Sequence, residues 1–190
     1  MAGKKIGILA LQGAVKEHVN ILNQLNCSPV KVKNKNDFKD LDGLIIPGGE
    51  STTIGKLLLE YDLFAIIKKK TRKGMGVFGT CAGLILVANK IQETNQPTLG
   101  LMDIEVKRNA FGRQINSFEK ELEIPVLGPP PYPGVFIRAP LIQKTGKNVD
   151  ILAIIDNKIV MARENNILVS AFHPELTDDP RMHKYFLDLI

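Results

Sequence analysis

Apolar residues in the first half of the chain follow two alternating patterns. Short, nearly continuous runs of Ile, Val and Leu, such as KIGILAL at residues 5–11, are typical of strands covered on both faces. Between these runs lie stretches such as VKEHVNILNQL, whose apolar residues form one helical stripe of Val15, Val19, Leu22 and Leu25. The alternation predicts strand–helix units, and therefore a parallel sheet with right-handed crossovers.

Two further units repeat this order. The segment DGLIIPGGEST predicts a strand over residues 44–46, a Pro-Gly-Gly turn, and Ser51 or Thr52 as the cap of the next helix. MGVFGT followed by CAGLILVANKI then predicts a third strand and its helix. These units place the protein in the α/β class.

The second half of the chain consists mainly of strand-like segments. Six segments are strand-like, namely LMDIEVK, SFEKELEI, GVFIRA, DILAIID, KIVMARE and ILVSAF, and Asp156-Asn157 predicts a tight hairpin turn. The proline-rich segment 126–134 (VLGPPPYPG) is interpreted as a rigid surface loop, and a helix is expected from about Asp179. We therefore expect a mixed, largely parallel central sheet within a single domain spanning residues 1–190.

Composition narrows the class of protein. The net charge of +5 is not gathered into a basic surface with interleaved aromatic residues, and KKKTRK at 68–73 fits the solvated end of a helix, so we expect no nucleic-acid partner. No apolar run is long enough to span a bilayer, so no membrane association is expected. Only two cysteines are present, which favours a cytoplasmic protein, and no metal site is predicted because neither cysteine has metal-ligand spacing.

One cysteine lies in a segment typical of a nucleophile. GTCAG at residues 79–83 has the glycine–nucleophile–glycine spacing of a nucleophile elbow, between a predicted strand and a predicted helix. A helix that begins just after Cys81 would favour its reactive thiolate and would offer an oxyanion-hole donor. The alternative, a small buried cysteine in the core, is weaker because Gly79 and Gly83 flank it.

A thiol nucleophile needs a base, and the chain has three histidines. His18 and His183 lie in amphipathic helices beside charged residues, whereas His173 follows the apolar strand ILVSAF. In a parallel sheet this position is at the same edge as Cys81. Glu175, two residues further on, can hold the tautomer of His173, so these three residues form a candidate catalytic triad.

PGGEST at residues 47–52 has two interpretations. It is either a tight turn with a capping serine or a pair of backbone N–H groups that bind an anion or oxyanion. It is not a phosphate-binding loop, because the required lysine and glycine spacing is absent.

Taken together, these segments resemble a known family. LALQGA, IPGGEST, GTCAGLI, RNAFGRQ, FIRAP and FHPELT are similar, nearly end to end, to the glutaminase subunits of pyridoxal 5′-phosphate synthase. The elbow cysteine and His-Pro-Glu alone would indicate only the wider class I, triad-type glutamine amidotransferases. LQGAVKEH, RNAFGRQ and FIRAP narrow the resemblance to the pyridoxal phosphate branch. The proline-rich loop at 126–134 differs from what the family leads us to expect.

The resemblance implies a three-layer α/β/α sandwich and a role for each matching residue. Cys81 would attack the side-chain amide of L-glutamine, His173 would carry the proton to ammonia, and Glu175 would orient His173. Hydrolysis of a glutamyl thioester would then give glutamate. The implied glutamine contacts are Gly49, Glu50, Ser51, Arg108, Ile137 and Arg138. The implied oxyanion donors are the backbone amides of Gly49 and Ala82.

The resemblance also implies a partner. The family's glutaminases act in a hetero-oligomer with a synthase subunit that is a (β/α)8 barrel and that combines the ammonia with pentose and triose phosphates. Gln12, within LALQGA, matches the segment that meets this partner. No cofactor is expected for the glutaminase itself.

Three other functions remain open. A glutaminase that feeds nucleotide or imidazole biosynthesis would have the same triad but another partner. A DJ-1-like redox protein would also have an elbow cysteine, although His-Pro-Glu and Arg108 would then have no assigned function. A binding module could keep the fold without the chemistry.

Overall fold

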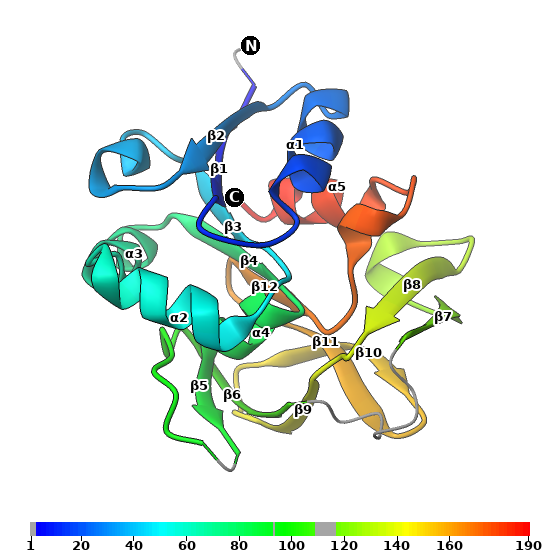
Figure 1. Cartoon of the computed structure of the whole chain (residues 1–190). Coiled ribbons are helices and arrows are strands. Elements are labelled where there is room, and N and C mark those ends of the chain that lie inside the picture. Colours follow the sequence, from blue (N-terminus) through cyan, green and yellow to red (C-terminus); the bar gives the residue numbers. More distant parts are fainter. Residues whose placement is uncertain (1–2, 93, 109–116) are drawn as a thin grey trace.

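The computed structural model describes residues 3–92, 94–108 and 117–190. A curled, ten-stranded sheet runs through the molecule (Figure 1). Its strands are β1 (Lys5–Leu9), β2 (Ser28–Val32), β3 (Gly43–Ile46), β4 (Gly76–Thr80), β5 (Ala88–Ile91), β6 (Met102–Lys107), β9 (Leu141–Thr145), β10 (Asp150–Ile155), β11 (Lys158–Glu164) and β12 (Ile167–Ser170). A separate antiparallel pair consists of β7 (Ser117–Leu122) and β8 (Tyr132–Ile137).

The helices are short. The α-helices of the described residues are α1 (Val15–Gln24), α2 (Ser51–Glu60), α3 (Phe64–Arg72), α4 (Ala82–Val87) and α5 (Arg181–Asp188). The same residues also contain 3₁₀ turns, η1 (Lys35–Phe38), η2 (Pro125–Leu127) and η3 (Pro174–Leu176). None of the helices in the described part of the chain has the length and apolar content to span a lipid bilayer.

The sheet confirms the expected mixed topology. The strand order is β2-β1-β3-β4-β12-β11-β9-β6-β5, with β10 paired to β11. The first five strands of this order are parallel, and the sheet turns antiparallel at β11, β9 and β6. Ser170, at the end of β12, is therefore in register with Thr80, at the end of β4. This register places the segments that follow the two strands at one edge of the sheet.

Helices cover both faces of the parallel half. The crossover through α1 leads from β1 to β2, whereas the crossover through α2 and α3 leads from β3 to β4 in the opposite direction along the sheet. Since such crossovers are right-handed, the two sets of helices lie on opposite faces. Figure 1 shows α5 beside α1, and α4 beside α2. The expected three-layer α/β/α sandwich is confirmed.

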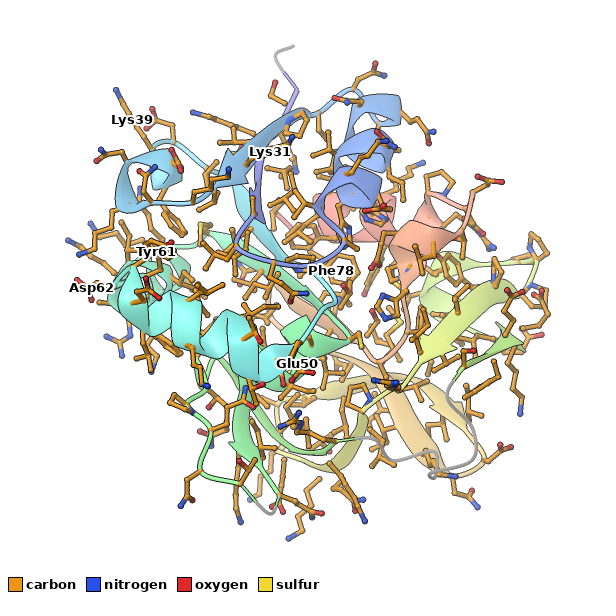
Figure 2. All side chains as sticks on the ribbon, viewed as in Figure 1. Lys31, Lys39, Glu50, Tyr61, Asp62 and Phe78 are labelled. Carbon is orange, nitrogen blue, oxygen red and sulfur yellow. The ribbon has the colours of Figure 1, made fainter. Side chains whose placement is uncertain are left out.

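The central strands explain the unbroken apolar runs in the sequence. Every residue of β3, β4 and β12 is buried, as expected for parallel strands covered on both faces. Phe78 of β4, labelled in the interior in Figure 2, packs its ring 5.5 Å from that of Phe186 and 5.7 Å from that of His183. The side of β4 next to α5 is therefore aromatic.

Several local predictions are confirmed. Asp156 and Asn157 both have positive φ, 46° and 61°, between β10 and β11, as a tight hairpin requires. The basic segment at 68–73 lies at the C-terminal end of α3, where Lys69, Lys70 and Arg72 form the last turn. The closing helix begins at Arg181, with Pro180 at its N-terminal cap.

Other local predictions are wrong. The helix after Cys81 ends at Val87, and the chain continues directly as β5, because Ala88 pairs with Met102 of β6. All six residues of α4 are buried, so its apolar run has no polar face to reveal where the helix ends. The cap of α2 is Glu50 rather than Ser51 or Thr52, since Glu50 Oε1 accepts a hydrogen bond from the Thr52 N–H at 3.3 Å.

The proline-rich segment 126–134 is part loop and part strand. Its first residues complete η2, and from Tyr132 onward the chain forms β8. Arg181 fixes the intervening turn, because its guanidinium donates to the carbonyl oxygens of Gly128 at 2.8 Å and Pro130 at 2.7 Å. Asp179 accepts from the same guanidinium at 2.5 Å. The loop is therefore tied to the segment between η3 and α5.

Replacing Arg181 with Ala should destabilise the protein, because several charge-assisted hydrogen bonds to loop carbonyls would be lost. For a side chain that is only 23% exposed we expect a loss of about 1–2 kcal/mol in the free energy of unfolding, or about 2–8 °C in Tm. Thermal unfolding measures this effect. Lys184→Ala, at an exposed position of the same helix, is the control. Equal Tm values for the two variants would contradict the role assigned to Arg181.

Candidate active site

Cys81 lies at a sharp turn between β4 and α4. Its backbone has φ 49° and ψ −100°, a conformation that a non-glycine residue adopts only under strain. The turn is fixed because the Cys81 N–H donates to the Ser170 carbonyl oxygen at 2.8 Å. The side chain is 7% exposed, and its Sγ lies 3.8 Å from the carbonyl oxygen of Ile137. This geometry is that of a nucleophile elbow.

The two glycines of GTCAG are required by close packing. A Cβ on Gly79 would lie 2.7 Å from the carbonyl carbon and oxygen of Gly83. A Cβ on Gly83 would lie 2.0 Å from the carbonyl oxygen of Ile46, at the end of β3. The start of α4 therefore lies against two strands at a distance that only glycine permits. This packing explains the glycine–nucleophile–glycine spacing identified in the sequence.

His173 and Glu175 meet Cys81 at the edge of the sheet. His173 follows β12, and its backbone N–H donates to the Val135 carbonyl oxygen of β8 at 2.8 Å. Its Nδ1 lies 2.8 Å from Oε1 of Glu175, at the first turn of η3. Both side chains are almost fully buried, so this hydrogen bond is shielded from water.

The surroundings of His173 favour its charged form. Burial alone would lower the pKa of His173, but hydrogen bonds with Cys81 and Glu175 outweigh burial and raise it to about 10. Near neutral pH the imidazole is therefore a cation between a sulfur and a carboxylate. Gly48 packs against this ring so closely that a Cβ there would lie 2.3 Å from His173 Cε1.

A pocket of about 320 Å³ opens beside the cysteine, at the small end of the range of roughly 300–1,000 Å³ for ligand sites. Every expected glutamine contact lines it, together with Cys81 and His173. The lining residues are Gly49, Glu50, Ser51, Cys81, Ala82, Ile85, Arg108, Ile137, Arg138 and His173. The structure thus brings all these residues together, and it adds Ile85, which the sequence did not indicate.

Two residues of opposite charge that line the pocket lie close together. Arg108 lies 3.3 Å from Oε1 of Glu50, which stands at the N-terminal end of α2 near the middle of the molecule in Figure 2. Hydrogen bonds from Thr52 and the nearby Arg108 lower the pKa of the Glu50 carboxyl group. Gln96 accepts a hydrogen bond from Arg108 at 3.4 Å. The rest of the RNAFGRQ motif, residues 109–114, lies outside the described residues.

Gln12 connects the β1–α1 loop to the pocket. Its exposed side chain accepts a hydrogen bond from the Glu50 N–H at 2.8 Å through Oε1. In the same loop, Gly13 has φ 111° and lies against Gly48, whose carbonyl oxygen accepts from the Ala14 N–H at 3.1 Å. The two loops that contain LALQGA and IPGGEST therefore form one rim of the pocket.

Sequence reasoning missed His18 and His183. Both are fully buried, and His18 Nδ1 lies 2.8 Å from His183 Nε2. His18 Nε2 lies 3.6 Å from Oε2 of Glu175. The sequence does contain one indication that His18 is buried. It lies three residues after Val15 and four residues before Leu22, which places it on the apolar face of the helix.

The sheet topology and the pocket at the strand ends define a class of protein. A solved structure described as a glutamine amidotransferase superposes with a TM-score of 0.93 and 46% sequence identity, covering 97% of each chain. A glutamine amidotransferase from Thermotoga maritima shares the fold with a TM-score of 0.64, at 12% identity, over 100% of this chain and 95% of the other. The fold is that of the glutamine amidotransferases.

The sequence defines the family within this class. Residues 8–190 match the SNO glutamine amidotransferase family, and the chain belongs to it. Two relatives are each named pyridoxal 5′-phosphate synthase subunit PdxT. That of Carboxydothermus hydrogenoformans is 53% identical over 98% of this chain and 97% of its own length. That of Pelotomaculum thermopropionicum is 55% identical, over 97% and 94%. The resemblance and the predicted glutaminase class are confirmed.

The three histidines should titrate differently. Burial lowers the pKa of His18 well below 6.5, and that of His183 to about 3, so only His173 should carry a proton between about pH 7 and 9. NMR titration of the imidazole signals measures this. Cys81→Ala should lower the pKa of His173, because one hydrogen bond is lost, whereas Cys27→Ala should leave it unchanged. Three histidines that titrate together near pH 6.5 would contradict the assignment.

Proposed function

We propose that this chain hydrolyses L-glutamine to L-glutamate and ammonia in the pocket beside Cys81, and delivers the ammonia to a synthase subunit that makes pyridoxal 5′-phosphate. The observation that carries the proposal is the strained, buried Cys81 next to the hydrogen-bonded His173–Glu175 pair. Family membership and the names of the relatives support the choice of substrate and pathway.

Recognition of glutamine uses the charges around the pocket. Free glutamine has one carboxylate and one ammonium group on its Cα. The Arg108 guanidinium would bind the carboxylate, and the Glu50 carboxylate offers a partner for the ammonium. Ser51, Ile137 and Arg138 line the same pocket as further contacts. Together they would place the side-chain amide beside the sulfur.

The reaction proceeds through a covalent intermediate. The Cys81 thiolate attacks the amide carbon, and the charge that develops on the amide oxygen is stabilised by the backbone N–H groups of Gly49 and Ala82. His173 gives its proton to the departing nitrogen, the C–N bond breaks, and ammonia leaves a glutamyl thioester. Neutral His173 then takes a proton from water, which attacks the thioester and releases glutamate and the thiolate. Glu175 holds the imidazole in position throughout.

The ammonia requires a protected route. At neutral pH free ammonia is mostly ammonium, which is not a nucleophile, so a closed passage to the synthase keeps it reactive. We place the (β/α)8 barrel of the synthase against the rim that contains Gln12, because a contact there would act directly on the Glu50 N–H at the pocket. We assign the complex to the cytoplasm, in agreement with two cysteines that form no disulfide.

Cys81→Ala should reduce glutamate release to the background rate, because the sulfur that forms the thioester is removed. The experiment measures glutamate from glutamine for each variant, in the absence and in the presence of a pyridoxal 5′-phosphate synthase partner. Cys27→Ala is the matched control and should keep wild-type activity. Wild-type turnover that is equal with and without the synthase would indicate a different amination pathway. Failure of the wild type to release glutamate in either condition would refute the glutaminase function.

Arg108→Ala should weaken glutamine binding, because a charge-assisted pair with the substrate carboxylate is lost. We expect kcat/KM to fall by about 10- to 100-fold, mainly through KM, which corresponds to about 1.5–3 kcal/mol. Steady-state kinetics with the synthase present measure the change. Arg72→Ala, at the exposed end of α3, serves as the control. An unchanged KM would remove Arg108 from the glutamine site.

A further inference from the structure

We propose that His18 is a positioning residue of the candidate triad: its neutral imidazole lies against Glu175 and holds the carboxylate oxygen that His173 does not use. The inference rests on the proposed glutaminase function. It assigns a role to a buried cluster on α1 and α5 that lies outside the glutamine pocket.

The two oxygens of Glu175 have different surroundings. Oε1 lies 2.8 Å from Nδ1 of His173, within hydrogen-bond distance. Oε2 is buried, has no hydrogen-bond partner among the described residues, and lies 3.6 Å from His18 Nε2. A buried carboxylate oxygen is costly unless a polar group stabilises it. The 3.6 Å separation is longer than a hydrogen bond, but contacts between catalytic groups are often long without substrate and shorten when it binds, so an N–H of His18 can then donate to Oε2.

The neighbours of His18 determine which nitrogen carries its proton. If Nε2 carried no hydrogen, its lone pair would face the Glu175 carboxylate, and the two would repel. Nε2–H towards Glu175 removes this repulsion, so Nδ1 must accept from Nε2–H of His183 at 2.8 Å. The buried Nδ1 of His183, which has no partner among the described residues, is then an acceptor rather than an unpaired donor. One arrangement of protons therefore suits all three residues.

The charge state of His18 also fits this role. The ionisable groups that face it are Glu175 on η3, His183 on α5 and His173 beyond Glu175. A protonated His18 would neutralise Glu175 and repel the His173 imidazolium. Burial lowers the pKa of His18, so the side chain stays neutral and can orient the carboxylate without cancelling its charge.

A second contact links His18 to the pocket. Thr80 Oγ1, at the end of β4, lies 3.5 Å from His18 Nε2 and accepts a hydrogen bond from the Gly48 N–H at 3.0 Å. Gly48 in turn packs against the His173 ring. His18 therefore borders both the carboxylate that orients His173 and the turn that supports its ring.

The test compares side chains that keep or remove the donor. In His18→Gln the amide nitrogen reaches the place of Nε2, whereas in His18→Asn it reaches only that of Nδ1, and His18→Leu has no donor. Asn23→Ala, on the exposed face of α1, is the control. Each variant is assayed with the synthase for kcat and KM. Each is also alkylated alone with iodoacetamide across the pH range, with modification of Cys81 followed by mass spectrometry, and its folding is checked by circular dichroism.

We expect His18→Leu and His18→Asn to lower kcat by about 10- to 100-fold with little change in KM. In both variants the pH profile of Cys81 alkylation should move, because the imidazole beside the sulfur is less firmly held. His18→Gln should restore most of kcat and the wild-type profile. If His18→Leu does not fold, the Gln and Asn variants decide.

Folded Leu or Asn variants with wild-type kcat and alkylation profile would overturn the inference. So would equal losses in Gln and Asn, since they would indicate packing rather than a donated hydrogen bond. If the wild type releases no glutamate, the proposed function fails, and the alkylation profiles alone decide the role of His18. A wild-type Cys81 that does not react at any pH would contradict both.

Discussion

The close approach of α4 to the ends of β3 and β4 is the constraint on which the candidate site depends. Gly79 and Gly83 bring these backbones so near that no side chain fits between them. The chain must therefore turn sharply between β4 and α4, and Cys81 takes the strained conformation at that turn. The fully buried strands β4 and β12 keep the backbone in this conformation, which costs of order 1–3 kcal/mol.

Four ionisable groups follow one another outward from this turn. Sulfur, imidazolium, carboxylate and a neutral imidazole follow one another from Cys81 through His173 and Glu175 to His18. They come from four different segments, namely the elbow, the turn after β12, η3 and α1. Because each group is buried, its contacts with the neighbouring groups rather than with water set its orientation. The chemistry therefore depends on packing between distant parts of the chain as much as on the residues themselves.

This dependence explains what could be predicted from the sequence. GTCAG and the histidine after ILVSAF revealed the elbow and its neighbour, because local spacing and parallel topology place them at one edge. The contact of His18 with Glu175 could not be predicted, since it requires α1 to pack on a turn more than a hundred residues away. Likewise, the length of α4 was overestimated, because a helix that is buried on all sides has no periodic pattern of polar residues to show where it ends. Arg138 could be assigned to the pocket only through the family resemblance, because nothing else in the sequence distinguishes it from a surface residue.

The three histidines also affect how the stability of the fold depends on pH. His18 and His183 are neutral when buried but would bind protons in the unfolded chain below pH 6.5, so the fold loses stability as the pH falls below that value. His173, whose pKa is raised to about 10, stabilises the fold fully below pH 6.5 and loses this contribution as the pH rises through 10. The combined contribution of the three residues is therefore greatest near pH 6.5, so the groups that shape the site stabilise the fold less on either side of that pH.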